Sequence, residues 1–173
     1  MTDRLRLPEV VASLEGTPAG LSALLRGLPR EMLAWHPPGS GRWCIKEVVG
    51  HLTETDRHDF VDRIRLMLDH DDPLLTVSDQ VEVARLRHDC DRDLDALLDE
   101  FRLQRAASLS YVAGLGSEEL RRGGTHPKIG HLQIENLLHE WIYHDMNHIR
   151  QVVVNAQGFL WNHLGNMQRF YQP

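Results

Sequence analysis

The sequence predicts an all-α protein, built as a bundle of four long helices in a single domain spanning residues 1–173. Three observations support this fold class. Apolar residues recur every three to four positions over four long stretches, which is the period of an amphipathic helix. Glycine and proline clusters separate these stretches. The chain length and the 42% content of hydrophobic residues suit one folded domain.

The first two helical stretches are joined by a loop rich in glycine and proline. The first stretch covers residues 8–28, and Thr17 and Pro18 inside it predict either a kink or a later helix start at Pro18. The second begins after Cys44, which occupies the N-cap position, with Glu47 three residues later as in a capping box. Its apolar stripe continues to Leu68.

The third and fourth stretches follow the same helical period. The third covers residues 91–113 and the fourth residues 133–156, with Gly158 as the expected C-terminal stop. We expect the remaining tail, residues 159–173, to pack against the bundle. No stretch of the sequence predicts a β-strand.

The lengths of the links predict the helix directions. Residues 71–89, between the second and third helices, are numerous enough to cross the whole length of the bundle. That crossover leaves the second and third helices parallel, while short links elsewhere make their neighbours antiparallel. The predicted order is therefore up-down-down-up.

Composition and charge exclude several classes of function. A net charge of −6 disfavours a nucleic-acid partner, which needs a basic face. No apolar run approaches the ~20 residues of a membrane helix, and the charged N-terminus lacks a signal core, so we expect a cytoplasmic protein. Cys44 and Cys90 are too few for a disulfide framework, and we expect both thiols to be free.

The eleven histidines are the most informative feature of the sequence. His144 and His148 are four residues apart, so that both rings lie on one face of the fourth helix. Such a pair suits two ligands of one metal ion. In a histidine-rich chain, however, the spacing alone is a weak signal.

His51 is the best candidate for a third ligand. It lies seven residues after Cys44, at the start of the second helix, and His148 lies seven residues before Asn155, near the expected end of the fourth. If these helices are antiparallel, their matched offsets of roughly 10 Å bring the three rings to one level. The alternative is that His51 is a hydrogen-bonded core histidine or faces solvent.

Three imidazoles with no fourth protein ligand are typical of a catalytic metal site with open positions. The ligand type fits Zn²⁺ or Ni²⁺ first, and also Fe²⁺ or Cu²⁺, without choosing among them. Glu47 lies one turn before His51, and Glu140 one turn before His144; either carboxylate could orient a ring or act as a catalytic base. The alternatives are a helix cap for Glu47 and a solvent-facing position for Glu140.

Two segments carry a family resemblance that covers nearly the whole chain. Residues 43–52, W-C-I-K-E-V-V-G-H-L, resemble the W-S-x-x-E-V-x-x-H-L opening of the second helix in DinB-like proteins. Residues 141–151, W-I-Y-H-D-M-N-H-I-R-Q, resemble that family's W-x-x-H-D-x-x-H-x-x-Q segment. The resemblance implies a four-helix bundle with a divalent metal ion on His51, His144 and His148. Cys44 and Gln133 depart from the family's serine and threonine helix caps.

The resemblance also implies a class of reaction. Some relatives transfer a low-molecular-weight thiol such as mycothiol, bacillithiol or glutathione, so a metal-dependent thiol S-transferase is the first hypothesis. A metal-dependent hydrolase and a non-catalytic, stress-associated metal-binding protein are the alternatives. We expect a small-molecule substrate and a homodimer. The expected pocket lining is Trp43, residues 80–88 and Trp161, with arginines for an anionic cosubstrate at positions 42, 85, 87 and 92.

Overall fold

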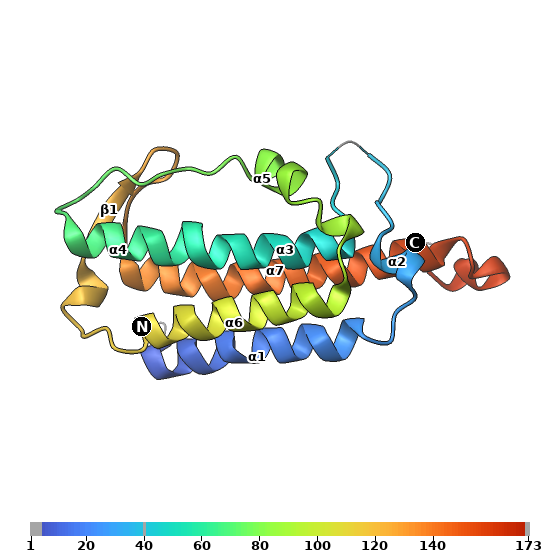
Figure 1. Ribbon diagram of the computed structural model, residues 1–173, viewed down its shortest axis with the longest axis horizontal. Coiled ribbons are helices and arrows are strands. Elements are labelled where there is room, and N and C mark those ends of the chain that lie inside the picture. Colours follow the sequence, from blue (N-terminus) through green and yellow to red (C-terminus); the bar gives the residue numbers. More distant parts are fainter. Residues whose placement is uncertain (1–4, 40, 172–173) are drawn as a thin grey trace.

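The computed structural model describes residues 5–39 and 41–171, and its four long helices lie side by side (Figure 1). One of them is a composite, in which a π-helical segment, η1, joins two α-helical parts. The long helices are α1 (Leu7–Leu25), α3–η1–α4 (Ile45–Thr55, Asp56–Val61 and Asp62–Asp69), α6 (Leu94–Val112) and α7 (Ile134–Trp161). The predicted all-α four-helix bundle is confirmed.

Short elements fill the links between the long helices, and the last of them follows α7. They are α2 (Arg30–Leu33), α5 (Gln80–Arg87), η2 (Asp89–Asp91), η3 (Glu119–Arg121), β1 (Gly123–His126), β2 (Gly130–Gln133) and η4 (Gly165–Phe170). The strands β1 and β2 form a small antiparallel hairpin in which His126 pairs with Gly130. The expectation of no strand is therefore wrong at this one place, because two four-residue strands that contain three glycines between them are too short to show an alternating pattern.

The ends and interiors of two helices also differ from the prediction. α1 continues through Pro18 without a break, and α7 continues through Gly158 to Trp161. A Cβ atom at Gly158 would lie 2.9 Å from the ring of Trp35. Gly158 therefore allows Trp35 to pack closely against α7, and this is a different use of glycine from the expected C-terminal stop.

Contacts between the helices establish their directions. Arg26 pairs with Asp95, and Arg105 contacts Leu14, so α1 and α6 are antiparallel. α3 and α6 are parallel, because the side chain of Lys46 donates to the carbonyl oxygen of Arg92 while η1 contacts Arg105. α3 is antiparallel to α7, as the contacts between Trp43 and Asn155 and between Phe60 and Trp141 require. The link that contains α5 runs along α3 and α4 (Figure 1).

The interior contains two apolar clusters with polar residues between them. One cluster gathers Val10, Leu14, Ile64 and Trp141, and the other gathers Leu21, Leu52, Phe101 and Val152, with their neighbours. Between these levels lie six polar residues, which we call the polar layer: His51, Asp56, Arg105, His144, Asp145 and His148.

Arg105 is the buried cation of the polar layer, with 1% of its surface exposed. Its guanidinium donates to the carboxylate of Asp56 at 2.7 and 2.9 Å and to that of Asp145 at 2.7 and 3.0 Å. Trp141 donates to Asp56 and Thr17 donates to Asp145. Burial raises the pKa of Asp56 to about 6, although the hydrogen bonds from Arg105 oppose the rise.

Arg105 also donates a hydrogen bond to a carbonyl group of α1 that Pro18 leaves without its helical partner. Pro18 has no backbone N–H, so the carbonyl oxygen of Leu14, four residues earlier, lacks the usual helical partner. The Nη1 atom of Arg105 donates to that oxygen at 2.7 Å. A proline in the interior of the helix is therefore accommodated without leaving this carbonyl group unsatisfied.

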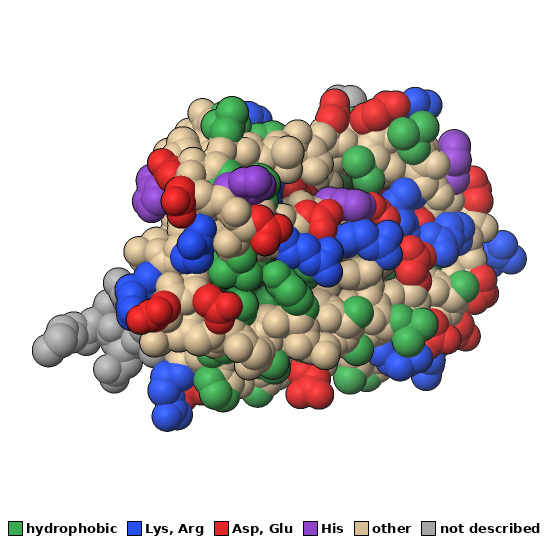
Figure 2. All heavy atoms as spheres, turned by 60° about the vertical axis from the view of Figure 1, so that its left-hand side comes forward, with side chains coloured by type: hydrophobic (Ala, Val, Ile, Leu, Met, Phe, Trp, Pro, Cys, Tyr) green, Lys and Arg blue, Asp and Glu red, His purple; other side chains and the backbone are tan. Residues whose placement is uncertain are grey.

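The surface mixes both signs of charge. On the face shown in Figure 2, several basic side chains form a row across the middle, and acidic side chains lie on both sides of this row. None of the helices in the described part of the chain combines the length and apolar character needed to cross a membrane.

We predict that Arg105→Met destabilises the fold by about 3–5 kcal/mol, because two buried carboxylates lose their cation. Arg102→Met, in the same helix, is the matched control. Arg102 is 61% exposed and pairs with an exposed Asp99, so its loss should cost less than about 1 kcal/mol. Urea unfolding at pH 7 measures both values, and similar midpoints for the two variants would contradict the prediction.

Candidate metal centre

The structure brings the three predicted histidines together inside the bundle. His51 comes from α3, and His144 and His148 come from successive turns of α7. One ring nitrogen of each lies within 4.8 Å of the others, and the Nε2 atoms of His51 and His144 are 3.1 Å apart. The ring centroids are 4.4–5.1 Å apart. Such a convergence from two helices is the geometry of a shared metal ion.

A hydrogen bond fixes the register that aligns the three rings. The side-chain amide of Asn155 donates to the carbonyl oxygen of Trp43 at 2.9 Å, which ties α7 to the start of α3. His51 and His148 lie at nearly equal distances along the chain from this link. The matched offsets predicted from the sequence are therefore present, although α7 extends beyond its expected end.

Aromatic rings enclose the histidine cluster. The Trp43 ring lies 4.5 Å from His51 and 6.3 Å from His148 between centroids, and Phe60 presents itself edge-to-face to His144 at 5.4 Å. His51 is buried, with 7% of its surface exposed. These neighbours remove water from the rings and favour the neutral imidazole that a metal ion requires.

The electrostatic environment holds all three imidazoles neutral. Burial, reinforced by the nearby His148, lowers the pKa of His51 to about 3. Burial and the neighbouring His148 and His51 lower the pKa of His144 to about 2. Burial also lowers the pKa of His148, although the hydrogen bond that its ring makes to the amide oxygen of Gln151 opposes the shift. Protons therefore compete with a metal ion at lower pH than unperturbed histidines near pH ~6.5 would suggest.

Three further atoms bear on whether the cluster fits a metal ion. Gln151 lies 2.8 Å from the Nδ1 atom of His148, so its amide oxygen can accept that proton and leave Nε2 free to coordinate. Among the described residues, His144 Nδ1 and the side-chain oxygen of Gln80 are buried without a hydrogen-bond partner. Neutral rings, an oriented His148 and an unpaired polar atom beside the cluster all fit a divalent ion with coordinated water.

The sequence places Gln80 only within the expected pocket lining, residues 80–88, and Gln151 only at the end of the resembling segment, and it predicts no contact of either residue with the histidines. The position of Gln151, three residues after His148 on one helix, is the signal that could have found it. Gln80 follows the N-cap residue of α5, and only the folded crossover brings it beside α3.

Two surface hollows meet the cluster. One, of about 210 Å³, is lined by His51, His144, Gln80 and Glu140, among others. The other, of about 510 Å³, lies on the side of His148. A larger groove of about 680 Å³ runs between α1 and α6, away from the three histidines. Of the expected lining, Trp43 stacks on the rings and Gln80 joins the first hollow, whereas Trp161 lines a different one.

The two predicted catalytic carboxylates lie in different places. Glu140 shares the first hollow with His51 and His144, and desolvation raises its pKa even though the residue retains solvent access. Glu47 instead accepts a hydrogen bond from the backbone N–H of Cys44 and contacts His36. The prediction that Glu47 acts on the histidine cluster is therefore not supported by its contacts, which are those of the helix-cap alternative.

Most of the predicted arginines are already paired. Arg85 binds Glu82, while Arg87 and Arg92 share Asp89 and Glu100. Arg42 lines the second hollow. Sequence spacing located these arginines near the correct end of the bundle but could not show that three of them have acidic partners.

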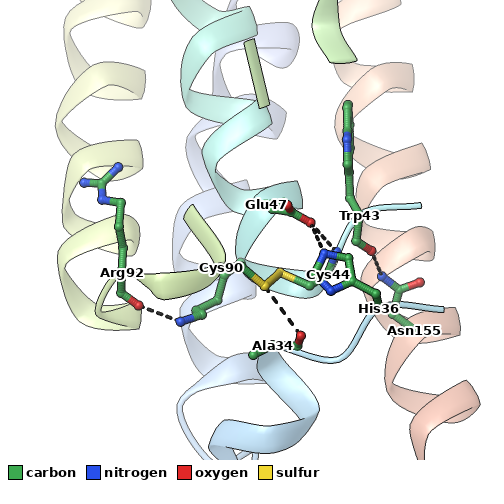
Figure 3. The surroundings of a disulfide bond; sticks show 9 residues. Ala34, His36, Trp43, Cys44, Glu47, Cys90, Arg92 and Asn155 are labelled. Carbon is green, nitrogen blue, oxygen red and sulfur yellow. Dashed lines mark hydrogen bonds and ion pairs between the residues drawn. A yellow bond between two sulfur atoms is a disulfide. The ribbon is translucent and has the colours of Figure 1, made fainter. Parts of the chain in front are cut away.

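The expectation of free thiols is wrong. Cys44 and Cys90 form a disulfide bond, with their Cα atoms 6.6 Å apart (Figure 3). The two residues are 46 positions apart in sequence. The parallel arrangement of α3 and α6 brings the segments before both helices to the same end of the bundle, and so brings these cysteines into contact.

Comparisons with known proteins agree with this fold and site. Residues 13–152 match the sequence model of the DinB superfamily. No curated protein matches the chain. A matching solved structure is YfiT from Bacillus subtilis, described as a probable metal-dependent hydrolase with an unusual four-helix bundle topology. The two chains are 20% identical, the match covers 93% of this chain and 91% of YfiT, and the TM-score is 0.80. YfiT therefore shares the fold.

We predict that the metal-free protein loses stability as the pH falls from about 6.5 toward 3. In this window the unfolded chain binds protons that the buried imidazoles do not take up, so the free energy of unfolding falls as the pH falls. His51 alone should account for about 2 kcal/mol between pH 8 and pH 5. Because Asp56 titrates with the opposite sign, the readout is the difference between wild type and His51→Asn in urea unfolding at both pH values.

The control for this pH dependence is His163→Asn, which changes an exposed histidine in the tail. It should keep the wild-type difference between pH 8 and pH 5. An equal pH dependence in wild type and His51→Asn would show that His51 is not held neutral by the fold.

We predict that His148→Ala abolishes tight binding of Zn²⁺ and Ni²⁺ while leaving the helical content unchanged. Gln151→Ala, which removes only the partner of His148, should weaken binding by roughly 10–100-fold. His139→Ala, on the same helix but outside the cluster, should bind as wild type does. Calorimetric titration with each metal, alongside circular dichroism, measures these effects. Wild-type affinity in His148→Ala would exclude this residue as a ligand.

Proposed function

The chain belongs to the DinB superfamily, and from that premise we propose that it is a metal-dependent hydrolase acting on a small-molecule substrate. The observation that carries the proposal is the hollow of about 210 Å³ in which Glu140 stands beside His51 and His144. A metal site with an adjacent carboxylate is the arrangement by which many enzymes activate water. The description of YfiT points to the same class of reaction.

His51, His144 and His148 would hold the ion. Three imidazole nitrogens suit Zn²⁺ or Ni²⁺ first and also Fe²⁺ or Cu²⁺, and the donor set does not choose among them. When bound, a divalent ion supplies a Lewis acid that makes water a stronger nucleophile at neutral pH.

Glu140 and Gln80, which line the same hollow, would transfer the proton and orient the attacking water. Glu140 accepts a proton from the attacking water and returns it to the leaving group; its raised pKa brings it closer to the neutral range where both transfers are efficient. The buried side-chain oxygen of Gln80 accepts a hydrogen bond from that water and orients it. Trp43 and Phe60 shield the faces and edges of the rings from bulk solvent.

A specific observation favours thiol S-transfer as a second candidate. Arg42 and Arg150 line the hollow beside His148, and neither forms a hydrogen bond or an ion pair with the described residues. Two guanidinium groups of this kind would attract the carboxylates of an anionic thiol such as glutathione.

The predicted homodimer and the cytoplasmic location stay predictions.

One experiment separates the two reactions. The metal-loaded protein is assayed with chromogenic esters and amides, and in parallel with glutathione and a fluorogenic electrophile. We expect metal-dependent hydrolysis, with kcat lowered about 10²–10⁴-fold in Glu140→Gln at unchanged metal content. Glu118→Gln, a change at an exposed residue outside the hollow, should keep full activity.

Thiol conjugation without hydrolysis, weakened by Arg42→Ala, would replace the hydrolase with the transferase. Hydrolysis that is insensitive to metal removal or to Glu140→Gln would contradict the proposed roles of the ion and of this carboxylate.

A further inference from the structure

A second group of potential metal ligands lies at the start of α3 and includes both cysteines of the disulfide (Figure 3). His36, Cys44, Glu47 and Cys90 each present one ligand atom, and these atoms all lie within 4.8 Å of one another. They come from the loop after α2, from the beginning of α3 and from η2. Residues distant in sequence therefore converge here, as they do in the three-histidine cluster.

Glu47 organises one side of this group. Its Oε2 atom accepts the backbone N–H of Cys44 at 2.7 Å and lies 2.9 Å from Nε2 of His36. The side chain of Glu47 is 17% exposed and that of His36 is 50% exposed. The imidazole is thus held against the carboxylate at the surface, where an ion can enter, while Cys44 is fully buried.

Cys90 is held in place by its buried neighbour in the chain. Asp89 is 0% exposed and accepts hydrogen bonds from Arg87 and Arg92. It lies directly against Gly50 of α3, where a Cβ atom would come within 1.7 Å of its carboxylate. The Sγ atom of Cys90 lies 3.5 Å from the carbonyl oxygen of Ala34. These contacts anchor Cys90 against α3 in addition to the disulfide bond.

We propose that, when the disulfide is reduced, Cys44, Cys90, His36 and Glu47 form a second metal site that binds Zn²⁺. Two thiolates, an imidazole and a carboxylate are all zinc ligands, and four of them close a tetrahedral shell of the structural type. Ligand atoms of tetrahedral zinc lie roughly 3.3–3.8 Å apart, so the group needs shifts of only about 1 Å to enclose the ion.

The disulfide and the zinc complex exclude one another. A dithiol reductant transfers two electrons and two protons to the disulfide, which gives two thiols and the oxidised reductant. Zn²⁺ then displaces both thiol protons. In reverse, hydrogen peroxide takes two electrons from the two thiolates and, with two protons, becomes two water molecules; the disulfide re-forms and zinc is released. The site is therefore occupied only under reducing conditions, in which protein disulfides generally open.

Metal stoichiometry in the two redox states tests this proposal. The full chain is loaded with Zn²⁺ after anaerobic reduction or after oxidation by hydrogen peroxide, and bound zinc is counted. We expect the reduced protein to hold one more zinc ion than the oxidised protein. With Co²⁺ as the probe, only the reduced form should show the near-ultraviolet thiolate-to-cobalt charge-transfer band, because the three-histidine cluster contains no sulfur.

This difference is independent of the proposed function. Oxidised protein that binds no metal would count against the three-histidine cluster but not against the second site. Equal zinc content in both redox states, or a reduced cobalt protein without the thiolate band, would overturn the second site and leave the first untouched.

Variants identify the ligands. His36→Ala keeps both cysteines and should weaken the additional zinc by about tenfold or more. His58→Ala is the matched control, since His58 is also 50% exposed and also contacts a glutamate. Cys90→Ser, or alkylation of the reduced wild type if that variant does not fold, should remove the additional zinc entirely. Equal affinity in the two histidine variants would exclude His36 as a ligand, and zinc retained after alkylation would exclude the thiolates.

Discussion

The bidentate contacts of Arg105 with Asp56 and Asp145 are the interaction on which the remaining geometry depends. This one guanidinium contacts α1, η1 and α7 from its own position on α6, so that it touches every long helix of the bundle. Successive residues on a helix point about 100° apart. With Asp145 turned toward Arg105, its neighbour His144 is directed toward α3 and the histidine cluster. The ion cluster thus sets the rotation of the helix that supplies two of the three histidines.

The ion cluster of Arg105, Asp56 and Asp145 has an electrostatic consequence for the three histidines of the same polar layer. When both carboxylates are ionised, the ions in this layer carry a net negative charge in a region of low dielectric, where charge interactions are strong. Burial is the main cause of the lowered pKa of both His144 and His148; Arg105 adds to the lowering at His144, whereas Asp145 opposes it at His148. Polar residues thus replace apolar ones at this level of the bundle. With both carboxylates ionised, they place a net negative charge beside a candidate cation site.

The sequence predicted the features that depend on spacing along one helix or on the length of one link. The helical period predicted the four helices. The length of the link at residues 71–89 predicted that the second and third long helices are parallel, and the matched offsets predicted that His51 and His148 meet. Features that depend on tertiary partners could not be predicted. Arg105 looks like a surface residue, because arginine is almost never fully buried unless it is paired, and its partners lie on other helices. The disulfide of Cys90 with Cys44 was missed for the same reason, whereas Glu47 makes the capping-box contact that its spacing predicts.

The partners of Arg105 are distant along the chain, at separations of 40, 49 and 91 residues. A chain that has assembled only two or three of its helices would bury charged groups without their full set of partners, which is strongly unfavourable. Partly assembled bundles are therefore penalised relative to both the unfolded and the complete state. The buried ion cluster should make folding closer to all-or-none than apolar packing alone would, and it should discourage any fragment that lacks one helix from persisting as a compact species.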